Sequence, residues 1–198
     1  MKEFWNERYN TESYVYGTEP NSFFRKQLTE YHPGRLLLPM EGEGRNAVFA
    51  AEKGWQVDAC DYSGQAREKA HNLAASRGVT ISYRICDMTR PDLASGIYDA
   101  AALIYAHMPP QERKRFHAAV AYSLKPGGIL IMEAFHKSQT GNDSGGPRDA
   151  SLLYDTTMLR DDFHDLRIVK LEQKEVTLDE GPGHRGRAAV VRGVMQKR

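Results

Sequence analysis

The sequence has few cysteines and lacks long apolar segments. Its 198 residues contain only Cys60 and Cys86, too few for a disulfide framework, and no Cys-x-x-Cys motif or Cys/His cluster indicates a metal site. No apolar stretch approaches the roughly 20 residues of a membrane-spanning helix. The first ten residues, MKEFWNERYN, lack the apolar segment of a signal peptide. We therefore expect a cytoplasmic protein with no metal site and no membrane partner.

The chain also lacks an excess of charge of either sign. It has 27 Lys and Arg residues against 26 Asp and Glu residues, a formal net charge of +1, and no block of like charges. This balance argues against a nucleic-acid partner, because nucleic-acid-binding domains usually carry a basic surface. The length suits one domain with a sizeable core. We expect a single domain over residues 1–198 that is a monomer or a homodimer.

Short apolar segments alternate with helical patterns between residues 35 and 135. Strands are expected at 35–40, about 55–60, 79–87, 97–106 and 129–135. Helices are expected at 45–53, after Ser63 and after Pro109, with Ser63 as an N-cap and a buried stripe formed by Ala66, Ala70, Leu73 and Ala74. Such alternation predicts right-handed crossovers and a parallel sheet covered by helices on both faces.

The two ends of the chain have a different character. Residues 1–31 are rich in aromatic side chains and are expected to form a helical flap in front of the first strand. Residues 137–150 are polar and rich in glycine and serine, which predicts a mobile loop. A short helix near 156–164 and an antiparallel hairpin of 166–180 with 185–196 are expected to follow.

A glycine turn joins the first strand to the next helix in the segment GRLLLPMEGEGRNAVFAAEKG, residues 34–54. Gly42 and Gly44 lack side chains and would let a ligand lie against the backbone. Asp61 ends the second strand, where a carboxylate can accept hydrogen bonds from both hydroxyls of a ribose. Asp87 and Met88 end the third strand, near the expected position of an adenine. The pattern predicts a ligand that contains adenosine.

Two cofactor classes fit this pattern. Gly42, Gly44 and Ala47 match the G-x-G-x-x-A motif of dinucleotide binding, so a NAD(P)-dependent oxidoreductase is one alternative. However, Glu41 and Glu43 lie in the turn and disfavour a pyrophosphate, which binds best where a helix N-terminus is free of negative charge. They suit a cationic ligand such as S-adenosylmethionine. The chain has no P-loop motif and no Tyr-x-x-x-Lys pair of the short-chain dehydrogenases.

Several segments together resemble the class I S-adenosylmethionine-dependent methyltransferases, and in particular the small tellurite-resistance-type methyltransferases. These segments are FWNERY, YVYGTEPNSFF, EGEGRNAVFAAEKGWQVDACDYS, CDM, YDAAALIYAHMPP, LKPGGILIMEAF and LDEGPGHRGRAAVV. The resemblance covers nearly the whole chain. It implies an α/β fold with a Rossmann-like, seven-stranded, mostly parallel sheet, helices on both faces and a C-terminal antiparallel hairpin. It also implies S-adenosylmethionine as the cofactor.

The resemblance implies that the glycine turn passes under the methionine part of the cofactor, and that the ends of the second and third strands hold the ribose and the adenine. The predicted cofactor-binding residues are Glu41, Gly42, Gly44, Arg45, Asp61, Tyr62, Asp87, Met88 and Tyr105. The chain departs from the family turn, with Leu38 in place of an aspartate and Met40 in place of the first glycine. Glu41 is expected to take over part of the lost carboxylate's task. A noncatalytic protein that binds S-adenosylmethionine is the second alternative.

Methyl transfer is an in-line displacement that depends mainly on alignment, and it requires a general base only when the nucleophile arrives protonated. The candidate catalytic residues are His107, Tyr16, His184 and Arg185. His107 follows the fourth strand, where it would orient the substrate, take a proton, cap the following helix or pack under the flap. Tyr16 would form part of a lid or pack against an extra helix. His184 and Arg185 would form a cationic rim or simply lie in a solvated hairpin tip.

The remaining histidines and a loop arginine receive simpler interpretations. His71 and His117 are expected on helix surfaces, and His136 in a solvated loop. Arg148 is a candidate contact for an anionic substrate, or is simply exposed. The sequence predicts a methyltransferase that acts on a small-molecule acceptor, and the resemblance implies a thiol or a metalloid oxyanion as the soft nucleophile.

Overall fold

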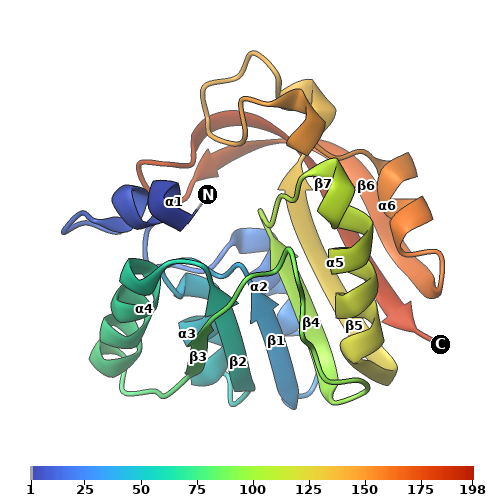
Figure 1. The fold of residues 1–198 in the computed structure, drawn as a ribbon, viewed down its shortest axis with the longest axis horizontal. Coiled ribbons are helices and arrows are strands. Elements are labelled where there is room, and N and C mark those ends of the chain that lie inside the picture. Colours follow the sequence, from blue (N-terminus) through green and yellow to red (C-terminus); the bar gives the residue numbers. More distant parts are fainter. Residues whose placement is uncertain (1) are drawn as a thin grey trace.

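The computed structural model of the protein describes residues 2–198 and has helices packed on both faces of one sheet. The elements in chain order (Figure 1) are α1 (Lys2–Tyr9), α2 (Ser22–Leu28), β1 (Arg35–Pro39), α3 (Arg45–Glu52), β2 (Gln56–Asp61), α4 (Gly64–Ser76), β3 (Ser82–Ile85), β4 (Tyr98–Ile104), α5 (Pro110–Ser123), β5 (Leu124–Phe135), the short 3-10 helices η1 (Lys137–Gln139) and η2 (Ala150–Leu152), α6 (Thr156–Asp162), β6 (Leu166–Asp179) and β7 (Arg185–Lys197).

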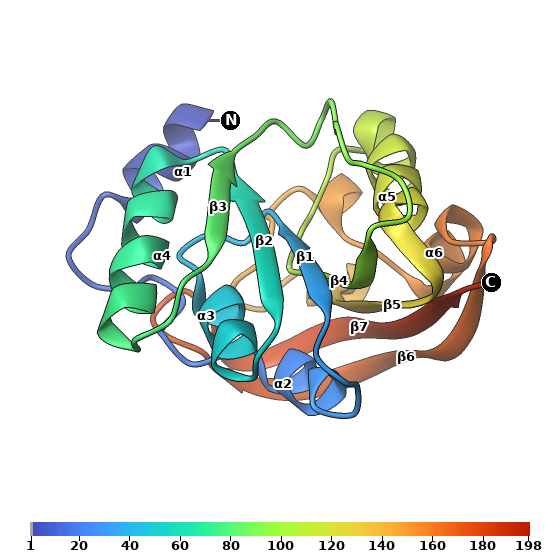
Figure 2. The same ribbon diagram turned by 90° about the horizontal axis from the view of Figure 1, so that it is seen from below.

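The sheet has seven strands in the order β3-β2-β1-β4-β5-β7-β6. Neighbouring strands from β3 to β5 are parallel, whereas β7 lies between β5 and β6 and is antiparallel to both. Figure 2 shows the long β6–β7 pair crossing the molecule beside the parallel strands. The predicted fold class is confirmed, including the antiparallel last strand next to the fifth.

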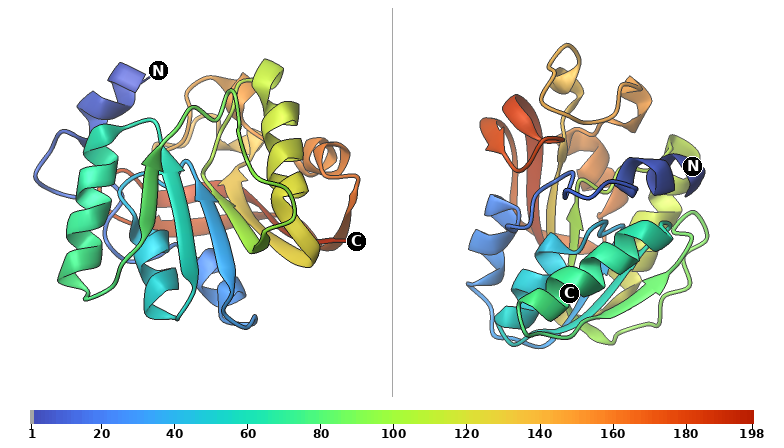
Figure 3. Two further views of the ribbon diagram at one scale, coloured as in Figure 1. Left: turned by 60° about the horizontal axis from the view of Figure 1, so that its bottom comes forward. Right: turned by 90° about the vertical axis from the view of Figure 1, so that its left-hand side faces the viewer.

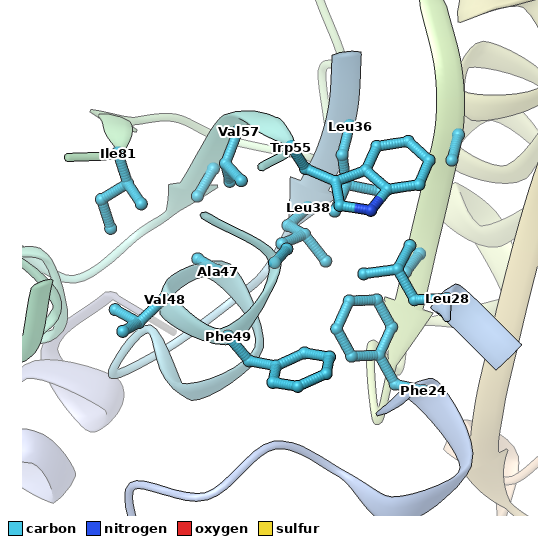
Figure 4. Close-up of a cluster of buried hydrophobic side chains, with 14 of the residues drawn as sticks. Phe24, Leu28, Leu36, Leu38, Ala47, Val48, Phe49, Trp55, Val57 and Ile81 are labelled. Atoms are coloured by element: carbon cyan, nitrogen blue, oxygen red, sulfur yellow. The ribbon is translucent and has the colours of Figure 1, made fainter. Parts of the chain in front are cut away.

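Consecutive residues of β1 point into two different cores. Leu36 and Leu38 pack with side chains of α2, α3 and α4, and Figure 4 shows Phe24 and Phe49 in this cluster. Leu37 packs on the opposite face, with side chains of α5 and α6. A strand buried on both faces explains why the segment reads as a continuous apolar run.

Local signals in the sequence correctly identify the start of α4 and its buried face. The Ser63 side chain accepts a hydrogen bond from the backbone N–H of Ala66 and thereby caps the helix. The predicted stripe is buried, and its members are Ala66, Ala70, Leu73 and Ala74. Helix α5 begins at Pro110, directly after Pro109, close to its expected start.

Two histidine expectations are wrong. His117 is fully buried, and its Nδ1 lies 2.8 Å from Oδ2 of Asp162, because α6 packs against α5 at this point. His136 is only 9% exposed, because its backbone pairs with Tyr154 and with Ala189 of β7. Both burials result from segments distant in sequence, which helix and loop patterns do not reveal.

Helix α1 and the segment 137–155 lie at the end of the molecule toward which β1 and β2 point (Figure 3). Ligands of open parallel sheets bind beyond the carboxyl ends of the strands, so these two segments cover the expected site. The flap role of 1–31 and the mobility of 137–150 stay predictions. Within residues 2–198, no helix is both long and apolar enough to cross a membrane.

Candidate functional site

A cavity of about 760 Å³ lies beyond the carboxyl ends of the central strands. Its volume is within the range of about 300–1,000 Å³ that is usual for small-molecule sites. Nine predicted site residues line it: Tyr16, Glu41, Gly42, Arg45, Asp61, Tyr62, Tyr105, His107 and His184. The other predicted residues, Gly44, Asp87, Met88 and Arg185, are not part of its lining.

The glycine turn has left-handed backbone conformations at three alternate positions. Their φ angles are +58° at Met40, +65° at Gly42 and +88° at Gly44. A Cβ on Gly42 would lie 2.8 Å from the phenol oxygen of Tyr9, a side chain of α1. A Cβ on Gly44 would lie 2.5 Å from the Cβ of Ala70, so this glycine permits the contact of α3 with α4. The absence of a side chain at Gly44 therefore serves helix packing, whereas Gly42 faces the cavity.

Glu41 follows β1 and binds the start of α3. Its Oε1 accepts hydrogen bonds from the backbone N–H groups of Asn46 at 2.9 Å and Ala47 at 2.8 Å. Its Oε2 accepts a hydrogen bond from the Asn46 amide at 3.3 Å. Burial raises the pKa of Glu41 to about 7, although these hydrogen bonds oppose the increase.

Glu43 was expected to suit a cationic ligand, but in the structure it pairs with a lysine. It is 4% exposed, and its Oε1 lies 2.6 Å from Nζ of Lys69. Its Oε2 accepts hydrogen bonds from the backbone N–H groups of Val15 at 2.9 Å and Tyr16 at 3.3 Å. Glu43 is neutralised by a lysine and holds the N-terminal segment, so Glu41 is the carboxylate of the turn that suits a cationic ligand.

Asp61 ends β2 and already participates in the turn. Its Oδ2 accepts a hydrogen bond from the N–H of Gly42 at 3.1 Å, and its Oδ1 accepts one from Ser63 at 3.0 Å. Burial raises the pKa of Asp61 above its usual value. The Tyr62 hydroxyl, beside it, donates a hydrogen bond to the exposed Asp87 carboxylate. These groups form the polar end of the cavity and its rim.

Met88 and Arg185 lie away from the cavity. Met88 is 2% exposed and packs in the core on the α5 face of the sheet. The Arg185 side chain is 79% exposed and its Nε lies 3.8 Å from Asp179. The hairpin alternates its side chains between two faces, and Arg185 is on the outer one.

His107 has both ring nitrogens occupied. Its Nδ1 lies 2.7 Å from the carbonyl oxygen of Leu152, and its Nε2 accepts a hydrogen bond from the backbone N–H of Phe135 at 3.2 Å. Burial lowers the pKa of His107 to about 4. This neutral imidazole holds the wall of the cavity together, and no lone pair is left to take a proton from a substrate.

Aromatic rings form the opposite end of the cavity. The ring of His184 is 4.5 Å from that of Tyr16 and 4.4 Å from that of Tyr105, and Tyr105 stacks on Phe135 at 4.6 Å. His184 is only 5% exposed, and burial lowers its pKa. The hairpin tip folds inward because the N–H of Gly183 donates a hydrogen bond to the carbonyl of Val15 at 2.8 Å.

A buried polar network behind the cavity was not identified from the sequence. The Asn21 side-chain amide donates hydrogen bonds to Glu133 at 2.6 Å and to Glu180 at 3.0 Å. Arg45 lies 2.8 Å from Glu180, and Arg192 pairs with Glu133. Burial opposes ionisation of Glu180, but His184 and Arg45 lower its pKa to about 2. The one visible signal was Glu133, an acidic residue inside the apolar segment ILIMEAF.

Known proteins resemble this chain in both sequence and fold. Residues 40–128 match the family model described as a methyltransferase domain. The tRNA 5-carboxymethoxyuridine methyltransferase of Escherichia coli (strain K12) is 30% identical over 101 residues, which are 50% of this chain and 39% of that protein. The chain therefore matches well under half the length of this curated relative.

Three solved structures cover the whole of this chain. A structure titled for the conversion of a disulfide bond into a thioacetal group during echinomycin biosynthesis has a TM-score of 0.79, 16% identity and 91% of its own chain covered. TehB from Haemophilus influenzae has a TM-score of 0.75, 15% identity and 67% covered. A SAM-dependent methyltransferase from Anabaena variabilis ATCC 29413 has a TM-score of 0.70, 17% identity and 93% covered. At these identities the likeness concerns the fold.

The fold is shared with these solved structures, one of which is a SAM-dependent methyltransferase. The match of residues 40–128 to the methyltransferase-domain model supports the predicted enzyme class and the prediction of S-adenosylmethionine as its cofactor. The residues present suit that cofactor, since a carboxylate, Glu41, faces the cavity beside the bare backbone of Gly42.

Proposed function

We propose that this protein transfers the methyl group of S-adenosylmethionine to a small molecule with a soft nucleophile, such as a thiol or a metalloid oxyanion. The observation that carries the proposal is one cavity with a polar end at β2 and an aromatic end at β4 and β5. A cavity of about 760 Å³ has room for a nucleoside-sized cofactor and a small acceptor together.

The residues of the polar end would hold the cofactor. Asp61 would accept hydrogen bonds from the ribose hydroxyls through the lone pairs that Gly42 and Ser63 leave free. Tyr62, at the rim, would contact the adenine, and Gly42 would let the methionine part lie against the turn. When bound, the cofactor supplies an electrophilic methyl group, and the chain contributes alignment and exclusion of water.

The aromatic end would receive the acceptor. Tyr16, Tyr105, Phe135 and His184 form a wall of rings, and such surfaces suit polarisable groups better than strongly hydrated ones. With both nitrogens of His107 occupied, an acceptor that arrives already ionised fits this site best. Thiolates and metalloid oxyanions meet that condition.

Two arginines at the cavity support an acceptor with negative charge. The Nε of Arg8 donates a hydrogen bond to the Tyr16 hydroxyl at 2.8 Å, and its guanidinium lies over the Tyr16 ring, with 5.4 Å to the centroid. Arg148 lies in the loop that also lines the cavity. Guanidinium groups placed in this way attract anions and orient them.

A methyl-transfer assay tests the proposal. The purified protein would be incubated with S-adenosylmethionine carrying a labelled methyl group, together with small thiols, tellurite, selenite or bulk transfer RNA. We expect label in a small-molecule product, loss of that activity in Asp61→Ala, and normal activity in Asp179→Ala, whose side chain is 86% exposed on the hairpin. Cofactor binding without transfer to any small acceptor would favour the noncatalytic alternative, and labelled RNA would contradict the acceptor class.

A further inference from the structure

The order of strands in the sheet indicates where the cofactor and the acceptor would lie relative to each other. Asp61 and Tyr62 follow β2, whereas Tyr105 and His107 follow β4. Strand β1 lies between β2 and β4 in the sheet, and Glu41 comes directly after the turn that ends it. If adenosine lies at β2 and the acceptor at β4, the sulfur that joins them must lie near the end of β1. This step rests on the proposed function.

Most of the acidic side chains around the cavity are unavailable to a cation near the end of β1. Four of them line it, namely Glu41, Glu43, Asp61 and Asp149. Glu43 is paired with Lys69 at 2.6 Å. Asp149 is exposed in the loop and caps η2, and Asp61 belongs to the adenosine end. Glu41 is therefore the carboxylate left at the end of β1.

The carboxylate of Glu41 is held in position without a basic partner. Its hydrogen bonds come from the first amides of α3 and from the Asn46 side chain, and among residues 2–198 it forms no ion pair. The nearby Arg45 is itself paired with Glu180 at 2.8 Å. An anion fixed by backbone amides but lacking a counter-ion favours a positively charged ligand beside it.

We propose that Glu41 makes the cavity bind the sulfonium of S-adenosylmethionine more tightly than the uncharged thioether of S-adenosylhomocysteine. The two molecules share the adenosine and the amino-acid group and differ in the methyl group and the positive charge on sulfur. Transfer of the methyl group removes that charge. Glu41 thereby loses its electrostatic partner at the moment of reaction, and the product is released more easily than the substrate.

Calorimetric titration with both molecules tests this assignment at pH 8. We expect Glu41→Gln to weaken binding of S-adenosylmethionine on the order of tenfold while S-adenosylhomocysteine changes little, as loss of one charge–charge interaction would cause. Asp61→Asn is the matched control, because the adenosine is common to both ligands and both affinities should fall by the same factor. Equal changes of both affinities in Glu41→Gln would overturn the proposal.

The wild-type protein offers an independent test by pH. Since burial raises the pKa of Glu41 to about 7, its negative charge is lost below that pH, and the preference for S-adenosylmethionine should shrink between pH 8 and 6. The other titratable or charged groups that contact Glu41 or line the same cavity include Arg45 on α3, Tyr83 on β3, Asp61 after β2, Tyr9 on α1, Glu43 in the turn and His184 of the hairpin.

The two sources of a pH effect are separable. His184 gains positive charge on acidification, so a preference that still declines in Glu41→Gln would assign the effect to His184 and overturn the proposal. A constant preference in the wild-type protein between pH 6 and 8 would overturn it as well, even if the variant does not fold. Failure of the wild-type protein to bind either molecule would instead contradict the proposed function, and the inference with it.

Discussion

The Nε2 atom of His107 accepts a hydrogen bond from the backbone N–H of Phe135 at 3.2 Å. The other ring nitrogen lies 2.7 Å from the carbonyl oxygen of Leu152. The histidine thus links the loop after β4 to β5 and to η2, and it does so as a neutral ring. His107 was expected to orient the substrate, to take a proton, or to have a capping or packing role, and in the structure it joins three segments of the cavity wall.

This role predicts a pH-dependent stability. The folded pKa of His107 is about 4, well below the ordinary 6.5, so the folded protein binds fewer protons than the unfolded chain. The stability that the neutral His107 ring contributes is fully present above pH 6.5 and is lost as the pH falls toward 4, by up to about 3 kcal/mol. In urea unfolding, the free energy of unfolding should fall less between pH 7.5 and pH 4.5 for His107→Gln than for the wild-type protein. An equal loss would contradict the account.

Gly44 and Gly64 form a matched pair for testing close packing. A Cβ on Gly44 would lie 2.5 Å from the Cβ of Ala70, and its φ is +88°. Gly44→Ala should therefore lower the free energy of unfolding by about 2–4 kcal/mol. Gly64 begins α4 with no atom within 4 Å of its Cβ position, so Gly64→Ala should be neutral or slightly stabilising. Chemical denaturation of both variants measures the difference, and a tolerated Gly44→Ala would contradict the packing described.

Glu43 is predicted to hold the N-terminal segment over the cavity. In Glu43→Gln, Lys69 loses its ion pair and the N–H groups of Val15 and Tyr16 keep at most a weaker acceptor. Removing one partner of such a largely buried pair costs about 3 kcal/mol. Hydrogen exchange of the amides of residues 13–16 should become faster, whereas the exposed neighbour variant Glu68→Gln should exchange as the wild type does. Unchanged protection in Glu43→Gln would show that other contacts hold the segment.

Glu180 is predicted to favour the protonated form of His184. Its Oε2 lies 3.9 Å from the Nδ1 of His184, and the carboxylate opposes the effect of burial, which lowers the histidine pKa. Glu180→Gln should therefore lower the pKa of His184 further, as followed by NMR of the imidazole protons. Glu175→Gln, at an exposed pair with Arg187, should leave that pKa unchanged. A pKa of His184 that is the same in both variants would contradict the coupling.

Much of the fold could be predicted because its signals are local. The Ser63 cap, the alanine stripe of α4 and the apolar strands depend on residues close together in sequence. The glycine turn is also a local signal, and it correctly indicated where a cavity opens. Met40 was a departure from the family turn, yet it adopts a φ of +58°, so the left-handed backbone persists without glycine.

The rest of the site depends on contacts between distant segments. Glu43 could not be assigned to Lys69 and the backbone of Val15 from sequence, because helix α4 and the N-terminal segment meet only in the folded chain. For the same reason Asn21 and Glu180, 159 residues apart, were not recognised as partners. His184 was expected in a cationic rim at the hairpin tip, and its burial follows from the tip folding onto Tyr16.

Calorimetric titration of the purified wild-type protein with S-adenosylmethionine, S-adenosylhomocysteine and NADH tests the central claim most directly. We expect the first two to bind to one site per chain and NADH not to bind, because the cavity presents Glu41 where a pyrophosphate would need a helix N-terminus free of negative charge. Binding of NADH without the other two would contradict it and favour the oxidoreductase alternative.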